Sequence, residues 1–149
     1  MRIRLLAVGK GRPDLAAFEA DFLRRLRAFA EVHIVELPEG RARHATQLRQ
    51  QEARGILRAA TEGFVLFDER GDAVSSRDWA RMFSSLAGNA RLDFVIGGAS
   101  GVDATVRQRA GRCWSLSRLT LPHQLVRILV LEQCYRAFTM LRGHPYHRA

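Results

Sequence analysis

The end of the sequence gathers, between Arg142 and Arg148, side chains that could do chemistry. Two histidines and a tyrosine lie between these arginines, at His144, Tyr146 and His147. A tyrosine ring can stack on a base, an arginine can bind a phosphate, and a histidine can accept a proton near neutral pH. Chain ends are often frayed, so this tail is either a frayed end or an arm that reaches a nucleic-acid substrate.

A glycine-rich stretch, residues 97–101, directly follows the apolar run from Leu92 to Ile96. Glycine lets a backbone turn sharply and come close to a ligand, and a helix that begins nearby offers free N–H groups. The spacing of Gly97, Gly98 and Gly101 is not the G-x-G-x-x-G fingerprint, and no Gly-Lys-Ser/Thr follows as in a P-loop. The stretch is either a tight turn between a strand and a helix or a ligand-binding loop.

The third stretch runs from Trp114 to His123 and passes from a strand-like segment into the longest apolar run of the chain. Pro122 suits the first turn of a helix, and Thr120 could cap that helix. In α/β proteins, ligands bind outside the carboxyl ends of the strands, where a strand gives way to a helix. We therefore predict that this segment is a ligand-binding turn.

Strand-like and helix-like segments alternate along the chain and must position these three stretches. Strands are expected at Ile3–Val8, Val32–Leu37, Phe64–Phe67, Leu92–Ile96 and Cys113–Leu116. Helices are expected from about Leu15 to Phe29, from Thr46 to about Ala60, from Ser75 or Ser76 to Leu86, after Asp103 or Thr105, and from Gln124 to Leu141. Asp14 is expected to cap the first of these helices, and Thr46, Ser75 or Ser76, and Asp103 or Thr105 to cap the next three. Regular alternation with short connections predicts an α/β fold, a mostly parallel sheet with helices on both faces. Residues 1–149 contain no linker or repeat, which predicts a single domain.

The expected final helix is apolar on nearly every side before Gln133. Such a helix must be buried on both sides, and in a chain of 149 residues one side should be covered by a second subunit. A two-fold homodimer is the default arrangement. Glu132 is an unusual charge there and could pair with Arg127 or Arg136 within one turn.

The composition favours a polyanionic partner. Lysine and arginine total 24 against 15 acidic residues, a net charge of +9, and Lys10 is the only lysine. Arginine forks onto phosphate and stacks on bases, so nucleic acid is the leading partner class. Cys113 and Cys134 lack a CxxC spacing and the histidines lack an HxxxH pair, which predicts no metal site. No signal peptide or bilayer-spanning run is seen, so we expect a cytoplasmic protein with no membrane partner.

Several short motifs occur in the order and spacing of a known family. They are Phe94-Val-Ile-Gly-Gly98, Trp114-Ser-Leu-Ser117, Leu119-Thr-Leu-Pro-His123, Leu125-Val-Arg127, Glu132-Gln133, Tyr135-Arg-Ala137 and His144-Pro-Tyr-His-Arg148. With them the whole chain resembles the pseudouridine N3-methyltransferases of the SPOUT superfamily, which act on large-subunit (23S) rRNA. The resemblance implies a C-terminal trefoil knot, an obligate homodimer and S-adenosylmethionine as the methyl donor. It also implies a pseudouridine of rRNA as the substrate, within the large subunit or the whole ribosome.

The resemblance also implies the site residues by motif match. Cofactor contacts would fall on Phe67, Gly97, Leu116, Ser117, Arg118, Leu119, Thr120 and Leu121. Catalytic residues would be Tyr146, His147, Arg148 and Arg136, with the tail reaching into the partner's site. His147 is the candidate base, an arginine would stabilise charge on the ring carbonyls, and Tyr146 would stack on the base. The chain departs from the family at Phe67, usually leucine, and at Ala99-Ser100, usually Pro-Glu, which removes a carboxylate.

Two other functions fit parts of the sequence. A non-catalytic RNA-binding or ribosome-associated dimer would carry the same basic charge. An enzyme acting on a small nucleotide could use the loop at Gly97, although no acidic ribose-binding residue or P-loop lysine is placed for it. Binding of S-adenosylmethionine separates the methyltransferase from the non-catalytic dimer.

Overall fold

Five parallel strands form one sheet at the centre of the molecule, which a computed structural model describes over residues 1–148. The strands are β1 (Arg2–Val8), β2 (Glu31–Leu37), β3 (Val65–Ala73), β4 (Arg91–Ile96) and β5 (Arg112–Ser115). Their order across the sheet is β2-β1-β4-β3-β5, and every neighbouring pair runs in parallel. The predicted alternation and the parallel sheet are confirmed.

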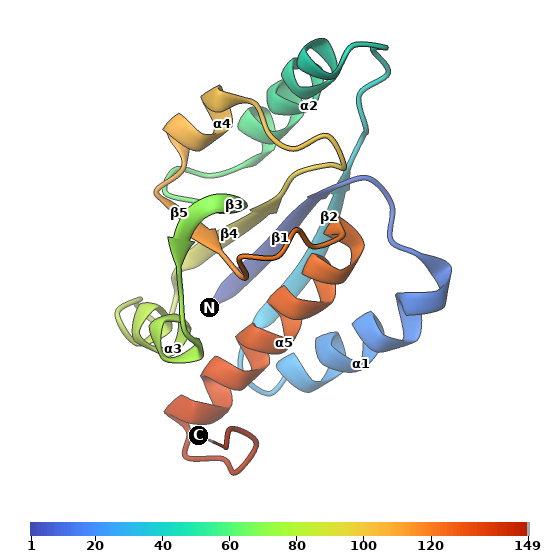
Figure 1. Cartoon of the computed structure of the whole chain (residues 1–149). Coiled ribbons are helices and arrows are strands. Elements are labelled where there is room, and N and C mark those ends of the chain that lie inside the picture. Colours follow the sequence, from blue (N-terminus) through green and yellow to red (C-terminus); the bar gives the residue numbers. More distant parts are fainter. Residues whose placement is uncertain (149) are drawn as a thin grey trace.

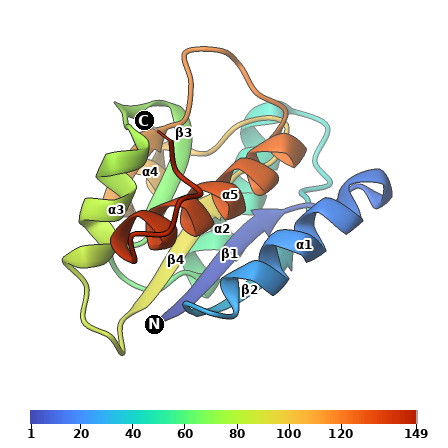
Figure 2. The same cartoon turned by 90° about the horizontal axis from the view of Figure 1, so that it is seen from below.

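Helices cover both faces of this sheet (Figure 1). They are α1 (Ala16–Leu26), which follows a short 3-10 helix (Pro13–Leu15), α2 (Ala45–Ala59), α3 (Ser76–Ser84), α4 (Ala104–Arg109) and α5 (His123–Leu141). Helices α1, α3 and α5 lie on one face, with α5 between the other two, while α2 and α4 lie on the opposite face (Figure 2). Each parallel connection therefore crosses from strand to helix and back, as the sequence predicts.

The core has two parts because strand side chains alternate between the faces of the sheet. On β4, Phe94 packs with Trp79 and Phe83 toward α3 and α5, whereas Val95 packs with Ile56 toward α2. Trp79 is only 1% exposed and belongs to the first of these two parts. Helix α2 is anchored to the other face of the sheet because Glu52, Ala53 and Ile56 are buried.

The helix caps confirm some of the sequence predictions and contradict others. Ser75 caps α3 in a reciprocal capping box with Asp78, and Asp103 caps α4, as expected. Asp14, Thr46 and Thr120 were each predicted to cap a helix, and these predictions are wrong. Asp14 is held by Arg12 within the 3-10 turn, Thr46 lies inside α2 and accepts from Arg49, and the Thr120 hydroxyl donates to Glu69.

Strand β3 continues beyond Phe67, where the sequence predicted its end. Its pairing with β5 shifts between Phe67 and Asp72, so residues 68–71 bulge out of the sheet before pairing resumes. Gly71 permits this because a Cβ there would lie 2.6 Å from the carbonyl carbon of Cys113. The bulge turns Asp68 and Glu69 toward the carboxyl edge of the sheet. Strand pairing does not decide whether the chain is knotted, so the trefoil knot stays a prediction.

Candidate functional site

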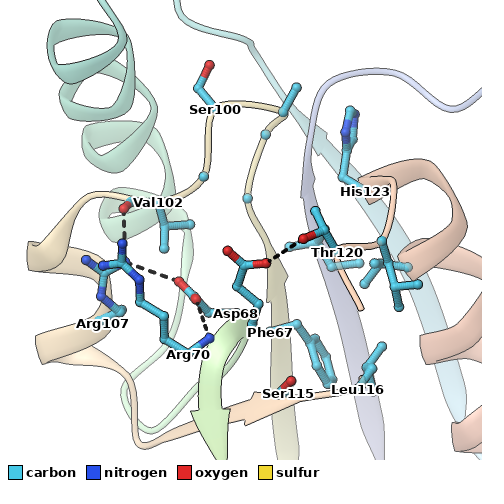
Figure 3. Close-up of a pocket in the computed structure, with 18 of the residues that line it drawn as sticks. Phe67, Asp68, Arg70, Ser100, Val102, Arg107, Ser115, Leu116, Thr120 and His123 are labelled. Carbon is cyan, nitrogen blue, oxygen red and sulfur yellow. Dashed lines mark hydrogen bonds and ion pairs between the residues drawn. The ribbon is translucent and has the colours of Figure 1, made fainter. Parts of the chain in front are cut away.

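A pocket of about 610 Å³ lies at the carboxyl ends of β3 and β4. Its walls come from the bulge after Phe67, the glycine stretch 97–101, and residues 115–121 that connect β5 to α5 (Figure 3). Such an edge is where parallel α/β sheets bind ligands. Among the residues predicted to contact a cofactor, all except Arg118 line this pocket: Phe67, Gly97, Leu116, Ser117, Leu119, Thr120 and Leu121.

Phe67 forms an apolar part of the pocket wall. Its ring is only 7% exposed and stacks on Trp79, with ring centroids 5.5 Å apart and an interplanar angle of 14°. Phe94 packs on the same ring from β4 at 5.5 Å. Because Phe67 is held on its inner side by two aromatic rings, it offers the pocket a fixed surface suited to a flat ligand.

The segment from Ser115 to Thr120 is braced by its own hydrogen bonds. The Ser115 hydroxyl donates to the Ser117 carbonyl at 2.8 Å, and the Leu119 backbone N–H donates to the Ser117 hydroxyl at 2.9 Å. Thr120 donates to the Glu69 carboxylate at 3.1 Å and so links this segment to the bulge of β3. Leu119 nevertheless keeps 72% of its surface exposed, so the segment presents an apolar side chain at the pocket.

The glycine stretch, residues 97–101, forms a tight turn and also lines the pocket. The two alternatives predicted for it, a tight turn and a ligand-binding loop, therefore do not exclude each other. A Cβ at Gly97 would lie 2.4 Å from a Val102 methyl group, and one at Gly98 would lie 2.9 Å from a Glu52 oxygen. Only glycine fits at either position without displacing these neighbours. Arg49 donates to the Ser100 carbonyl at 3.3 Å and holds the turn against α2.

Six charged residues of the pocket were not predicted as site residues: Arg49, Asp68, Glu69, Arg70, Asp103 and Arg107. Arg107 donates to the Asp68 carboxylate and to the Val102 carbonyl, both at 3.1 Å. The sequence showed Asp68-Glu-Arg-Gly71 only as the end of a strand. Its position directly after a buried strand, at the ligand-binding edge, is the signal that could have identified these carboxylates.

The predicted catalytic residues of the tail form a second cluster, around Glu132. Arg136 donates to Glu132 at 2.9 and 2.5 Å. Of the two predicted partners of this carboxylate, Arg127 and Arg136, Arg136 is therefore the one that binds it. The Tyr146 hydroxyl donates to the same oxygen at 3.1 Å, and Arg136 Nη1 lies 3.3 Å from Nδ1 of His147. The tail is therefore folded onto α5 rather than frayed. Arg148 is exposed, and no side-chain bond is found for it within residues 1–148.

The pocket lies at the start of α5, whereas the tail cluster is bound to the middle and second half of this helix. His123, the first residue of the helix, lines the pocket, while Glu132 and Arg136 lie about two and a half and three and a half turns further on. At the helical rise per residue, these distances along the helix axis are roughly 14 and 20 Å. In one chain, the structure does not bring the predicted cofactor residues and the predicted catalytic residues together.

Arg127, the other predicted partner of Glu132, has a different position. Its guanidinium is buried, with 4% side-chain exposure, and it donates to Glu19 at 2.8 and 3.1 Å and to Glu36 at 2.8 Å. The Gly11 backbone N–H also donates to Glu36, and Gln124 donates to the Lys10 carbonyl at 2.6 Å. The loop after β1 is thus fastened to the start of α5. The pKa of Glu36 lies below its usual value, because Arg127 and then the Gly11 N–H bind the charged carboxylate.

No group of three or more metal-ligating side chains gathers within residues 1–148. None of the helices in this part of the chain is long and apolar enough to cross a membrane.

Comparison with known proteins identifies the family. The family described as "Predicted SPOUT methyltransferase" matches residues 1–147. The chain belongs to the SPOUT methyltransferase family. It is 41% identical to a protein of Thiobacillus denitrificans named "Ribosomal RNA large subunit methyltransferase H", with 99% of both chains covered. It is 42% identical to a protein of the same name from Rhizobium meliloti, with all of both chains covered. The family resemblance drawn from the motifs is confirmed.

Solved structures of low sequence identity share the fold. A "probable methylase family protein" from Haemophilus influenzae matches with a TM-score of 0.55 and 12% identity over 99% of this chain and 70% of that one. A structure described as concerning the 2-OH methylation of C/U34 on tRNA matches with a TM-score of 0.52 and 16% identity over 96% of this chain and 98% of that one. The SPOUT-like α/β architecture is therefore the fold of this methyltransferase.

Proposed function

We propose that this protein transfers a methyl group from S-adenosylmethionine to N3 of a pseudouridine in large-subunit (23S) rRNA. The observation that carries the proposal is the pocket, which assembles the segments 97–101 and 115–121 at the carboxyl edge of the sheet. The motif match assigns the cofactor to these segments. The full-length relatives named as ribosomal RNA large subunit methyltransferases support the choice of substrate.

The residues of the pocket fit the proposed cofactor. A volume of about 610 Å³ falls in the usual range for small-molecule sites. The fixed ring of Phe67 suits an adenine, and the backbone of the braced segment 115–121 can hydrogen-bond to the edge of such a ring. The carboxylate of Glu69 suits the positive charges of the donor, and it lines the same pocket as Ala99-Ser100, where the chain lacks an acid. The bound cofactor supplies a methyl group already activated by its sulfonium.

A homodimer would complete the site, since the tail cluster lies far from the pocket of its own chain. On α5, Leu125 and Leu129 are 44% and 38% exposed, and Glu132 and Arg136 continue the same face at helical spacing. A partner packed against this face would lie directly beside the tail cluster. The two-fold arrangement would then bring each tail toward the partner's pocket.

The tail residues can take the roles that methyl transfer to N3 requires. Alignment of donor and acceptor is the main task, and Tyr146 can stack on the base while Arg136 or Arg148 stabilises charge on the ring carbonyls. His147 is the proposed acceptor of the N3 proton. Because Arg136 can only donate, Nδ1 of His147 is the accepting atom in their contact at 3.3 Å. His147 can therefore act as a base through Nδ1 once Arg136 turns to the substrate.

The decisive experiment uses ribosomes from a strain that lacks the gene. They are incubated with the purified protein and labelled S-adenosylmethionine, and the label is then mapped on the rRNA. We expect one labelled pseudouridine in the large subunit. Labelling of another base or of the small subunit would contradict the proposed substrate. If calorimetry detects no binding of S-adenosylmethionine, the protein is instead the non-catalytic, ribosome-associated dimer.

A further inference from the structure

The connection between β2 and α2, residues 38–44, carries three cationic or titratable side chains that have no role in the site described above. Arg41, Arg43 and His44 are all exposed. Within residues 1–148, none of these side chains takes part in a hydrogen bond or ion pair. By contrast, Arg12, Arg107 and Arg127 are each paired with a carboxylate. The connection therefore offers positive charge that no other part of the described chain neutralises.

The backbone of this connection is nevertheless held in place. The Gly40 N–H donates to Glu52 at 3.0 Å, and the N–H groups of Arg41 and Ala42 both donate to Gln51, at 2.9 and 3.1 Å. Three successive backbone donors are thus bound by two neighbouring side chains of α2. Gly40 is packed so closely that a Cβ would lie 2.8 Å from the Leu48 carbonyl. A cationic loop fixed in this way loses little conformational entropy when it binds a partner.

The same helix connects this loop to the pocket. Arg49 of α2 donates to Ser100, and the second oxygen of Glu52, buried and without a hydrogen-bond partner in the described residues, lies against Gly98. Ser100 and Gly98 both belong to the turn that lines the pocket. The loop after β2 also leaves the sheet at its carboxyl edge, as the pocket segments do (Figure 1). The loop therefore lies beside the pocket, and α2 holds both the loop and the turn that lines the pocket.

We propose that residues 38–44 form a phosphate-binding arm that holds the backbone of the RNA substrate beside the methyl-transfer pocket. This inference rests on the proposed function for its choice of RNA. Arginine side chains bind phosphate through paired donors, and phosphate contacts position a nucleic acid without reading its sequence. Gln51 and Glu52 are positioning residues, since they act by fixing the backbone from which the cations extend.

The first test removes the charge of the arm. The double variant Arg41→Ala/Arg43→Ala is compared with Arg54→Ala/Arg58→Ala, which removes two exposed, unpaired arginines from the body of α2. With ribosomes as substrate, we expect the arm variant to raise KM about tenfold with kcat nearly unchanged, and the control to match the wild type. In anisotropy measurements with a labelled stem-loop of large-subunit rRNA, the slope of log Kd against log salt concentration should be smaller by about one for each arginine removed. Equal behaviour of the two double variants would overturn the inference.

The second test removes the support without removing charge. In Gln51→Ala the Arg41 and Ala42 N–H groups lose their acceptor, whereas Gln50→Ala changes an exposed neighbour for which no hydrogen bond is found within residues 1–148. We expect Gln51→Ala alone to weaken RNA binding several-fold, with calorimetric binding of S-adenosylmethionine unchanged. Equal RNA affinity of the two variants would show that the support is irrelevant. If the wild type binds RNA through the arm but methylates no ribosome, the proposed function fails while the arm stands.

Discussion

The hydroxyl of Tyr146 donates to Glu132 at 3.1 Å and fastens the end of the chain to the helix that precedes it. Arg136 donates to the same oxygen, and its guanidinium carbon lies 5.0 Å from the centre of the Tyr146 ring. The pKa of Tyr146 lies above its ordinary value, because the phenol is desolvated and faces the negative charge of Glu132. The phenol therefore stays protonated and continues to donate at physiological pH.

Glu132→Gln should uncouple the tail from α5. The variant removes the charge that binds both Arg136 and Tyr146, and a hydrogen bond to a charged group contributes about 1.5–3 kcal/mol. We expect methyl transfer to ribosomes, measured in a single turnover, to fall at least about tenfold. Binding of S-adenosylmethionine should change little, because Glu132 is not among the residues that line the pocket. Tyr146→Phe, which removes only one donor, should cause a smaller loss, and wild-type turnover in Glu132→Gln would remove the tail from the mechanism.

Phe67 should contribute to both stability and cofactor binding. Phe67→Ala removes a buried ring that stacks on Trp79 and should lower the free energy of unfolding by about 3–5 kcal/mol. Phe67→Leu restores the usual residue of the family and should cost less than about 1.5 kcal/mol. Calorimetry at a temperature where both variants are folded should show weakened S-adenosylmethionine binding only for Phe67→Ala. Equal affinities would mean that the ring does not contact the cofactor.

Arg127 should matter for stability far more than an exposed arginine. Arg127→Ala removes a buried guanidinium from its two partners, Glu19, which is 14% exposed, and Glu36, which is 41% exposed, and should cost about 1.5–3 kcal/mol as the loss of hydrogen bonds between charged groups. Arg12→Ala breaks only the exposed pair with Asp14 and should change the free energy of unfolding little. Urea denaturation of both variants measures the difference. Similar midpoints would show that the buried network contributes little to folding.

Much of the fold follows from local pattern in the sequence. The apolar run at Phe64–Phe67 predicted a buried strand, and Ser75 or Ser76 predicted a helix start. Residues 97–101 and 115–121 could be located as site segments because strand ends in a parallel sheet meet at one edge.

The pairing of distant side chains could not be predicted in the same way. Thr120 has the composition of a helix cap, yet its partner is Glu69, 51 residues away. Arg127 has an acidic neighbour within two turns, yet it is bound by carboxylates 108 and 91 residues away. These partners are set by which elements the sheet brings together. Local propensity carries no information about them, because each choice of partner is decided by tertiary packing.

Asp93 ties β4 to β1 and to the end of α2, and it makes stability depend on acid. Arg4 donates to its two oxygens at 2.9 and 2.6 Å, and Thr61 donates to it through the backbone N–H at 2.8 Å and the hydroxyl at 2.9 Å. Burial acts to raise the pKa of Asp93, but the hydrogen bonds from Arg4 and Thr61 together outweigh it. The pKa of Asp93 therefore lies below its ordinary value of 3.8.

A lowered pKa in the folded state fixes the sign of the acid response. The unfolded chain binds a proton at Asp93 more readily than the folded chain, so this contribution to stability is complete above 3.8 and is lost as the pH falls through the folded pKa. Asp93→Asn should lower the free energy of unfolding at pH 7 by about 1–3 kcal/mol and should flatten its decline below pH 4. Urea denaturation from pH 7 to pH 3 measures both effects. Asp72→Asn, at an exposed carboxylate, is the control. If the free energy of unfolding of Asp93→Asn falls with pH as steeply as that of this control, other carboxylates cause the acid sensitivity.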